Sequence, residues 1–86
     1  MKMKIKNVNE INKDNLLKIM SESQLEYINN SKCVNLNEVV DNLKLYYNTI
    51  KKPFKKVLID EKLIDSTIEM IIGYKDWLYE MELKYE

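Results

Sequence analysis

Apolar residues recur every three to four positions over most of this chain, which is the spacing of one face of an α-helix. The clearest run lies between residues 35 and 52, and its apolar positions are Leu36, Val39, Val40, Leu43, Tyr47 and Ile50. Asn35 followed by Glu38 is a helix-start signal, and Pro53 disfavours a helical conformation at the residue before it. The pattern therefore predicts a helix over residues 35–52.

Two shorter helices are predicted in the first third of the chain. Asn12 is a favourable N-cap for a helix over residues 13–20. Ser23 and Glu26 have the spacing of a capping box, in which each side chain bonds the other residue's backbone N–H. A second helix is therefore predicted over residues 23–30, and the alternative is one helix that runs through both regions.

Two short segments each fit more than one structure. Residues 2–8 begin with alternating lysines and apolar residues, which is the period of a β-strand. A frayed terminus is the alternative for this segment. Residues 54–59 form a compact apolar run, which fits either the start of the last helix or a short extended bridge.

The last helix is predicted from about Asp60 to Lys84, and it carries two apolar stripes. The first stripe contains Ile64, Ile68, Ile71 and Ile72. The second is rotated from the first by roughly a quarter turn, at about 100° per residue, and contains Tyr74, Trp77, Leu78, Met81 and Tyr85. The two halves of this helix are therefore expected to pack on different surfaces, with Gly73 at the change.

Composition supports helices, because one glycine and one proline are too few for the tight turns of a β-rich fold. No segment has the composition of a linker, so we expect a single domain over residues 1–86. Its predicted fold class is all-α, a small bundle of three to four helices with a long C-terminal helix. Residues 2–8 are the candidate for a short N-terminal β-strand.

The charge is unevenly distributed, although the net charge is zero. Residues 1–56 hold eleven lysines and six acidic residues, a net charge of +5, whereas residues 57–86 hold three lysines and eight acidic residues, a net charge of −5. Such asymmetry fits an oriented contact with a partner, and the alternative is a set of ordinary solvated faces.

The residue types that are missing argue against catalysis and cofactors. Without histidine, Ser-His and Cys-His nucleophile pairs cannot form, and a single glycine excludes the phosphate-binding loops. The lone Cys33, in the predicted connection over residues 31–35, cannot build a zinc site or an internal disulfide. We therefore expect a protein that is not an enzyme and binds no cofactor or metal. No apolar run is as long as a membrane span, and a reduced cytoplasmic location is the simplest expectation.

A nucleic-acid contact is one functional hypothesis. Its candidate residues are Lys51, Lys52, Lys55 and Lys56, together with the lysines at positions 2, 4 and 6. A basic strand followed by helices resembles a ribbon-helix-helix repressor in outline, which implies a small dimeric DNA-binding transcriptional regulator. The chain contains no arginine, the residue on which specific DNA readers depend, so this function ranks second.

Protein binding is the leading functional hypothesis, with the candidate interface Tyr74, Trp77, Met81 and Tyr85. Trp, Tyr and Met are enriched at the centres of protein interfaces. The alternative is that these residues close the domain core or pack on Tyr46 and Tyr47.

The predicted partner is another protein, either a second copy in a homodimer or a protein of a host. A small, motif-free chain with the Lys, Asn and Ile content of an AT-rich genome resembles phage or mobile-element inhibitors such as anti-CRISPR proteins and antitoxins. A third hypothesis is that the acidic face of Asp65, Glu69, Asp76 and Glu80 mimics nucleic acid.

Overall fold

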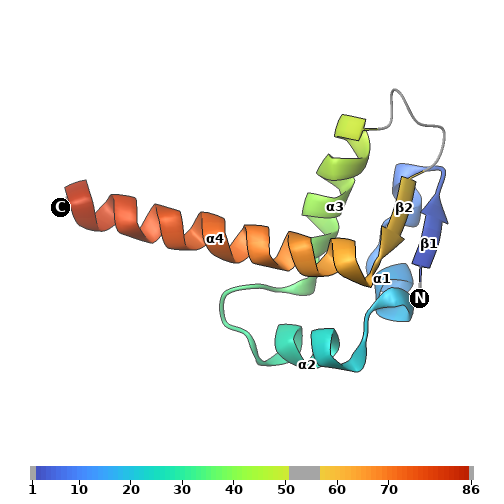
Figure 1. The fold of residues 1–86 in the computed structure, drawn as a ribbon, viewed down its shortest axis with the longest axis horizontal. Helices are drawn as coiled ribbons and strands as arrows, with labels where there is room; N and C mark the ends of the chain where they lie inside the picture. The colour runs from blue at the N-terminus through green and yellow to red at the C-terminus, as the bar shows by residue number, and fades with distance from the viewer. Residues whose placement is uncertain (1, 51–56, 86) are drawn as a thin grey trace.

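A computed structural model of the chain describes residues 2–50 and 57–85, the last of these by its backbone alone. Within these residues, four α-helices and a two-stranded sheet form a small body, from which the C-terminal helix projects (Figure 1). The molecule is elongated, with principal extents of 46 × 31 × 18 Å. The predicted helical fold with a long C-terminal helix and a short N-terminal strand is confirmed.

The sheet pairs the first element of the chain with the strand that precedes α4. Strand β1 (Lys2–Ile5) pairs antiparallel with β2 (Val57–Asp60), and the register places Ile5 opposite Val57. Ile5, Val57 and Ile59 point into the core, whereas Lys2 and Lys4 are exposed. Of the alternatives for residues 2–8, the strand is therefore correct over residues 2–5. In the apolar run over residues 54–59, residues 57–59 form the extended bridge rather than a helix, and residues 54–56 lie outside the described residues.

The first helices are short and separately capped. After the 3-10 turn η1 (Val8–Glu10), helix α1 (Lys13–Ile19) begins at the predicted cap, where the Asn12 side chain accepts a hydrogen bond from the backbone N–H of Asn15 at 2.9 Å. Met20 has an extended backbone and ends α1. The alternative of one continuous helix is therefore wrong.

The N-cap of helix α2 (Glu22–Asn30) lies two residues earlier than predicted, because its capping box uses a different serine. The backbone N–H of Gln24 donates to Ser21 Oγ at 3.2 Å, and the backbone N–H of Ser21 donates to Gln24 Oε1 at 3.0 Å. The predicted box of Ser23 and Glu26 is wrong, because Ser23 already lies inside the first turn of α2.

Helix α3 (Leu36–Ile50) carries the predicted apolar stripe into the core. The Asn35 side chain accepts from the backbone N–H of Glu38 at 2.9 Å, which confirms Asn35 as the start signal. Val39, Val40, Leu43 and Tyr47 are buried. Ser31–Asn35 is the connection between α2 and α3, as predicted.

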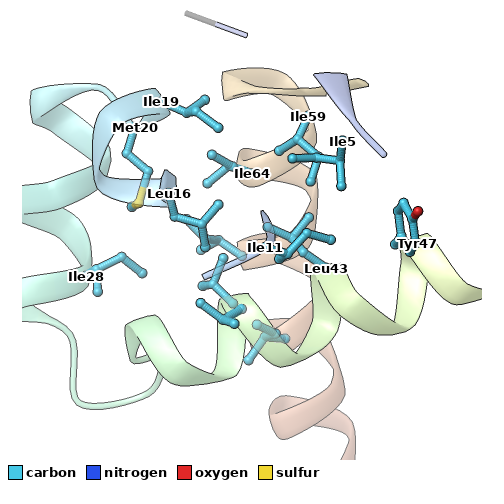
Figure 2. Close-up of a cluster of buried hydrophobic side chains, with 14 of the residues drawn as sticks. Ile5, Ile11, Leu16, Ile19, Met20, Ile28, Leu43, Tyr47, Ile59 and Ile64 are labelled. Carbon is cyan, nitrogen blue, oxygen red and sulfur yellow. The ribbon is translucent and has the colours of Figure 1, made fainter. Parts of the chain in front are cut away.

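Helix α4 (Glu61–Tyr85) begins where predicted, with Asp60 Oδ1 accepting from the backbone N–H of Leu63 at 2.9 Å. It continues without a break through Gly73. Ile64, Ile68 and Ile71 of its first stripe are buried. Figure 2 shows how Ile64 lies among side chains from α1, α3 and both strands. The core is thus assembled from every part of the body and uses only the first half of α4.

Candidate functional site

The second stripe of α4 lies outside the core. Tyr74 is 61% exposed and Trp77 is 53% exposed, whereas the buried isoleucines of the first stripe are at most 6% exposed. Figure 1 shows the C-terminal half of α4 extending away from the other elements. We call residues 73–85 of α4 the arm. In the single chain Tyr74, Trp77 and Tyr79 face solvent, and the two stripes have different surroundings.

The candidate interface residues lie next to one another along the arm. The rings of Tyr74 and Trp77 are stacked, with their centroids 6.2 Å apart and an interplanar angle of 27°. Met81 is partly buried and lies one turn further along the helix. The side chain of Tyr85 lies outside the described residues, although its backbone is helical. Three of the four predicted residues are therefore placed on one side of the arm.

Sequence reasoning missed Met70, which extends this surface toward the body. Met70 is 58% exposed, and its position follows the spacing of the stripe, four residues before Tyr74. The 4-3-4 spacing of Met70, Tyr74, Trp77 and Met81 was the signal that could have identified it, because residues at this spacing share one side of a helix. We call these four residues the arm seam.

Lys75 marks the point where α4 leaves the body. It occupies the position where the first stripe would continue, and its Nζ lies 2.8 Å from Glu38 Oε2 at the start of α3. The same ammonium group donates to the backbone carbonyl oxygen of Cys33. Both side chains are partly exposed, so the ion pair contributes at most about 1 kcal/mol. At this edge of the core, α4 therefore contacts α3 through a polar ion pair where the first stripe would have placed an apolar residue.

The arm also exposes apolar residues on another side. Tyr79 is 63% exposed, and it lies about 140° from Tyr74 around the helix at about 100° per residue. Leu83 is exposed near Tyr79, four residues further along. Tyr79 is therefore a matched comparison for Tyr74, because it has the same chemistry and exposure on a different face.

A shallow groove of about 390 Å³ lies between α2 and α4. Its lining residues are Ser23, Gln24, Tyr27, Asp65, Ile68, Glu69 and Ile72. The side-chain amide of buried Gln24 donates to the Glu61 carbonyl oxygen at 2.9 Å and to Asp65 Oδ1 at 2.6 Å. These bonds tie α2 to the first half of α4, so the polar groups at this place hold the fold together.

The predicted acidic face is also at the surface. Asp65, Glu69, Asp76 and Glu80 are all exposed along α4. Asp65 and Glu69 lie beside the groove on the body, whereas Asp76 and Glu80 lie on the arm. The negative charge of the last third of the chain is therefore spread along α4 and is not confined to its aromatic half.

The structure describes only some of the lysines that are candidates for a nucleic-acid contact. Lys51, Lys52, Lys55 and Lys56 lie outside the described residues. The side chains of Lys2, Lys4 and Lys6 are exposed at the sheet end of the body. Strand β1, which carries Lys2 and Lys4, pairs with β2 of its own chain. The DNA-binding function stays a prediction.

Within residues 2–50 and 57–85, no group of three His, Cys, Asp or Glu side chains could hold a metal ion. None of the helices described there combines the length and the hydropathy that a membrane span requires. Cys33 is an exposed free thiol in the connection before α3.

Comparisons with known proteins give no relative. No family model matches the sequence, and neither a curated protein nor a solved structure is significantly similar to it. The geometry of the arm is therefore the observation that bears most directly on function.

Proposed function

We propose that this chain is a non-enzymatic protein-binding module whose binding surface is the aromatic stripe of the arm. The observation that carries the proposal is the exposure of Tyr74 and Trp77 on a helix that has left its own core. Large contiguous apolar surfaces are uncommon on monomeric proteins and mark interaction sites. Tyr and Trp also dominate the binding energy of protein interfaces.

The shape of this surface favours a protein over a small molecule. Small ligands bind in concave pockets that enclose most of their surface, whereas the arm is a convex helix. A projecting helix with apolar residues on one side is the form in which helices dock into a groove or against another helix. The groove of about 390 Å³ lies on the body between α2 and α4, away from Tyr74 and Trp77.

Stoichiometric inhibition is the mode of action that we propose for such a module. A protein without catalytic groups acts on another protein by occupying its surface, in the manner of an anti-CRISPR protein or an antitoxin. The small size and the lysine-, asparagine- and isoleucine-rich composition of the chain fit a phage or mobile-element inhibitor of a host protein. The aromatic residues of the arm would supply the binding energy.

The proposal is tested by affinity capture from an extract of the native host, using three immobilised proteins. These are the wild type, the double variant Tyr74→Ala with Trp77→Ala, and the control Tyr79→Ala. Removing two central aromatic residues is expected to weaken binding by at least about 100-fold, at roughly 2 kcal/mol for each residue. Because all three side chains are exposed, the far-UV circular dichroism of the variants should match that of the wild type.

The expected result is a protein that the wild type and Tyr79→Ala both retain and that the double variant loses. That protein is then purified, and its Kd for the three proteins is measured by titration calorimetry. Equal affinity for the wild type and the double variant would show that the aromatic stripe is not the binding surface.

A further inference from the structure

We infer that a second copy of this chain binds the arm seam, with the two α4 helices antiparallel and Trp77 at the twofold axis. This inference rests on the proposed function, because it names a partner for the same surface. The spacing of the seam is its starting point. Met70, Tyr74, Trp77 and Met81 repeat at intervals of four, three and four residues, which is the heptad spacing through which two helices pack side by side.

A twofold axis at Trp77 makes the seam self-complementary. The two Trp77 rings then meet, and Tyr74 of each copy lies beside Met81 of the other, because these residues are three and four positions from the axis. Such an isologous interface uses the same surface patch on both copies. The methionine side chain is flexible and makes favourable contacts with aromatic rings, so the Tyr74 and Met81 pair is chemically suitable.

One charge pair and the helix dipoles favour the antiparallel orientation. In the antiparallel pair, Lys84 lies seven residues from Trp77 and comes beside Glu69 of the second copy, which lies eight residues from it. Opposed helix dipoles also favour this orientation.

The body leaves the inner end of the seam open. Met70 is 58% exposed although it lies on the part of α4 that contacts the core. Ile72, which lines the groove beside α2, lies about 160° from Met70 around the helix at about 100° per residue. Helix α2 is therefore on the opposite side of α4 from the seam. A second helix can approach Met70 without displacing α2.

The area of the seam is sufficient for a weak dimer. Aromatic side chains bury on the order of 150–250 Å² each, and about half or more of this area is exposed at Tyr74 and Trp77. With Met70 and the flanking residue Leu78, which are also exposed, each copy contributes up to about 500 Å². The pair then buries up to about 1,000 Å², which is near the lower limit for a specific interface. We therefore expect a dissociation constant in the micromolar range.

Trp77 is the only tryptophan in the chain, so its fluorescence reports directly on this interface. The full-length protein is diluted from about 100 µM to about 0.1 µM, a range that brackets the affinity of a small interface. Its mass is measured by analytical ultracentrifugation, and the Trp77 emission maximum is recorded at each concentration. The expected result is a change from two chains to one, together with a red shift of the emission. A single-chain mass and unchanged emission over the whole range would overturn the inference.

Matched variants locate the interface. Tyr74→Ala is expected to raise the dimer dissociation constant at least about tenfold, because it removes a ring from each side of a symmetric contact. Tyr79→Ala, with the same exposure on another face, is expected to change it less than about twofold. Equal weakening by both variants would show that the seam is not the contact surface. Far-UV circular dichroism confirms that the helices are retained in each case.

The orientation is tested by exchanging charges. Lys84→Glu is expected to weaken the antiparallel dimer, and adding Glu69→Lys to the same chain is expected to restore it. A Lys84→Glu variant with unchanged self-association would overturn the antiparallel arrangement.

These results also separate the inference from the proposed function. A protein that stays monomeric, but whose capture of a host protein still depends on Tyr74 and Trp77, would show that self-pairing is wrong and protein binding through the arm is right. A dimer that depends on Tyr74, with no host protein captured through the same residues, would support self-pairing and count against the inhibitor.

Discussion

The hydroxyl group of Tyr47 forms a hydrogen bond between α3 and the segment after β1. Tyr47 is 1% exposed, and its phenolic oxygen donates to the backbone carbonyl oxygen of Lys6 at 2.7 Å. A buried hydroxyl needs a hydrogen-bond partner, because leaving it unpaired costs free energy. The bond therefore fixes the end of the strand relative to the longest helix of the body.

Tyr47→Phe tests this connection, because it removes the hydroxyl and keeps the ring. The variant is expected to lower the free energy of unfolding by about 1 kcal/mol, since the Lys6 carbonyl oxygen loses its donor inside the protein. The neighbouring variant Tyr46→Phe is the control, because Tyr46 is exposed and its change should be below about 0.5 kcal/mol. Urea unfolding followed by circular dichroism measures both. Equal effects would contradict the role assigned to the Tyr47 hydroxyl.

At the scale of the element, the sequence at the start of α2 is compatible with two different capping boxes. The segment Ser21-Glu22-Ser23-Gln24-Leu25-Glu26 contains two serines, each followed three residues later by Gln or Glu. The structure uses Ser21 and Gln24. Gln24 also donates to Glu61 and Asp65 of α4, so the choice of capping box is coupled to the packing of α2 against that helix.

Two serine variants distinguish these solutions. Ser21→Ala is expected to lower the free energy of unfolding by about 1 kcal/mol, because it removes the acceptor of the Gln24 backbone N–H. Ser23→Ala changes an exposed residue within the helix and is expected to have an effect below about 0.5 kcal/mol. Thermal or urea unfolding of the two variants gives the comparison. A larger loss with Ser23→Ala would favour the Ser23 and Glu26 box.

For the whole molecule, the division between body and arm is the main feature. The buried core ends at Ile71 on α4, and the ion pair of Lys75 and Glu38 lies at its edge. Beyond this point, nearly all the described side chains of the arm are exposed. Isolated helical segments of this length are marginally stable in water, so the proposed partner would add stability to the arm.

Truncation after Asp76 tests whether the body folds without most of the arm. At about 1 µM, where mass action keeps dimers scarce, the free energy of unfolding is expected to fall by less than about 1 kcal/mol. The urea m-value is expected to change little, because it scales with the area exposed on unfolding. The truncated chain should also lose concentration-dependent association. A loss of cooperative unfolding would show instead that the arm is part of the fold.

Several local features of this protein follow directly from its sequence. Residues 13–19 and 36–50 form helices after Asn12 and Asn35, and α4 begins after Asp60, as the caps and the apolar spacing predicted. The two stripes of α4 were also visible, because side-chain direction repeats at every turn of a helix. These features involve residues only a few positions apart, and their interactions are present in any fold that keeps the helix.

Only the tertiary structure decided which surfaces find partners within the chain. It paired β1 with β2, chose Ser21 over Ser23 for the cap of α2, and buried the isoleucines of α4 while leaving Tyr74 and Trp77 in solvent. An apolar stripe has the same sequence pattern whether it packs on its own chain or on another molecule. What separates the two cases is whether the chain brings a second surface to it, and in this protein the core ends before the arm begins.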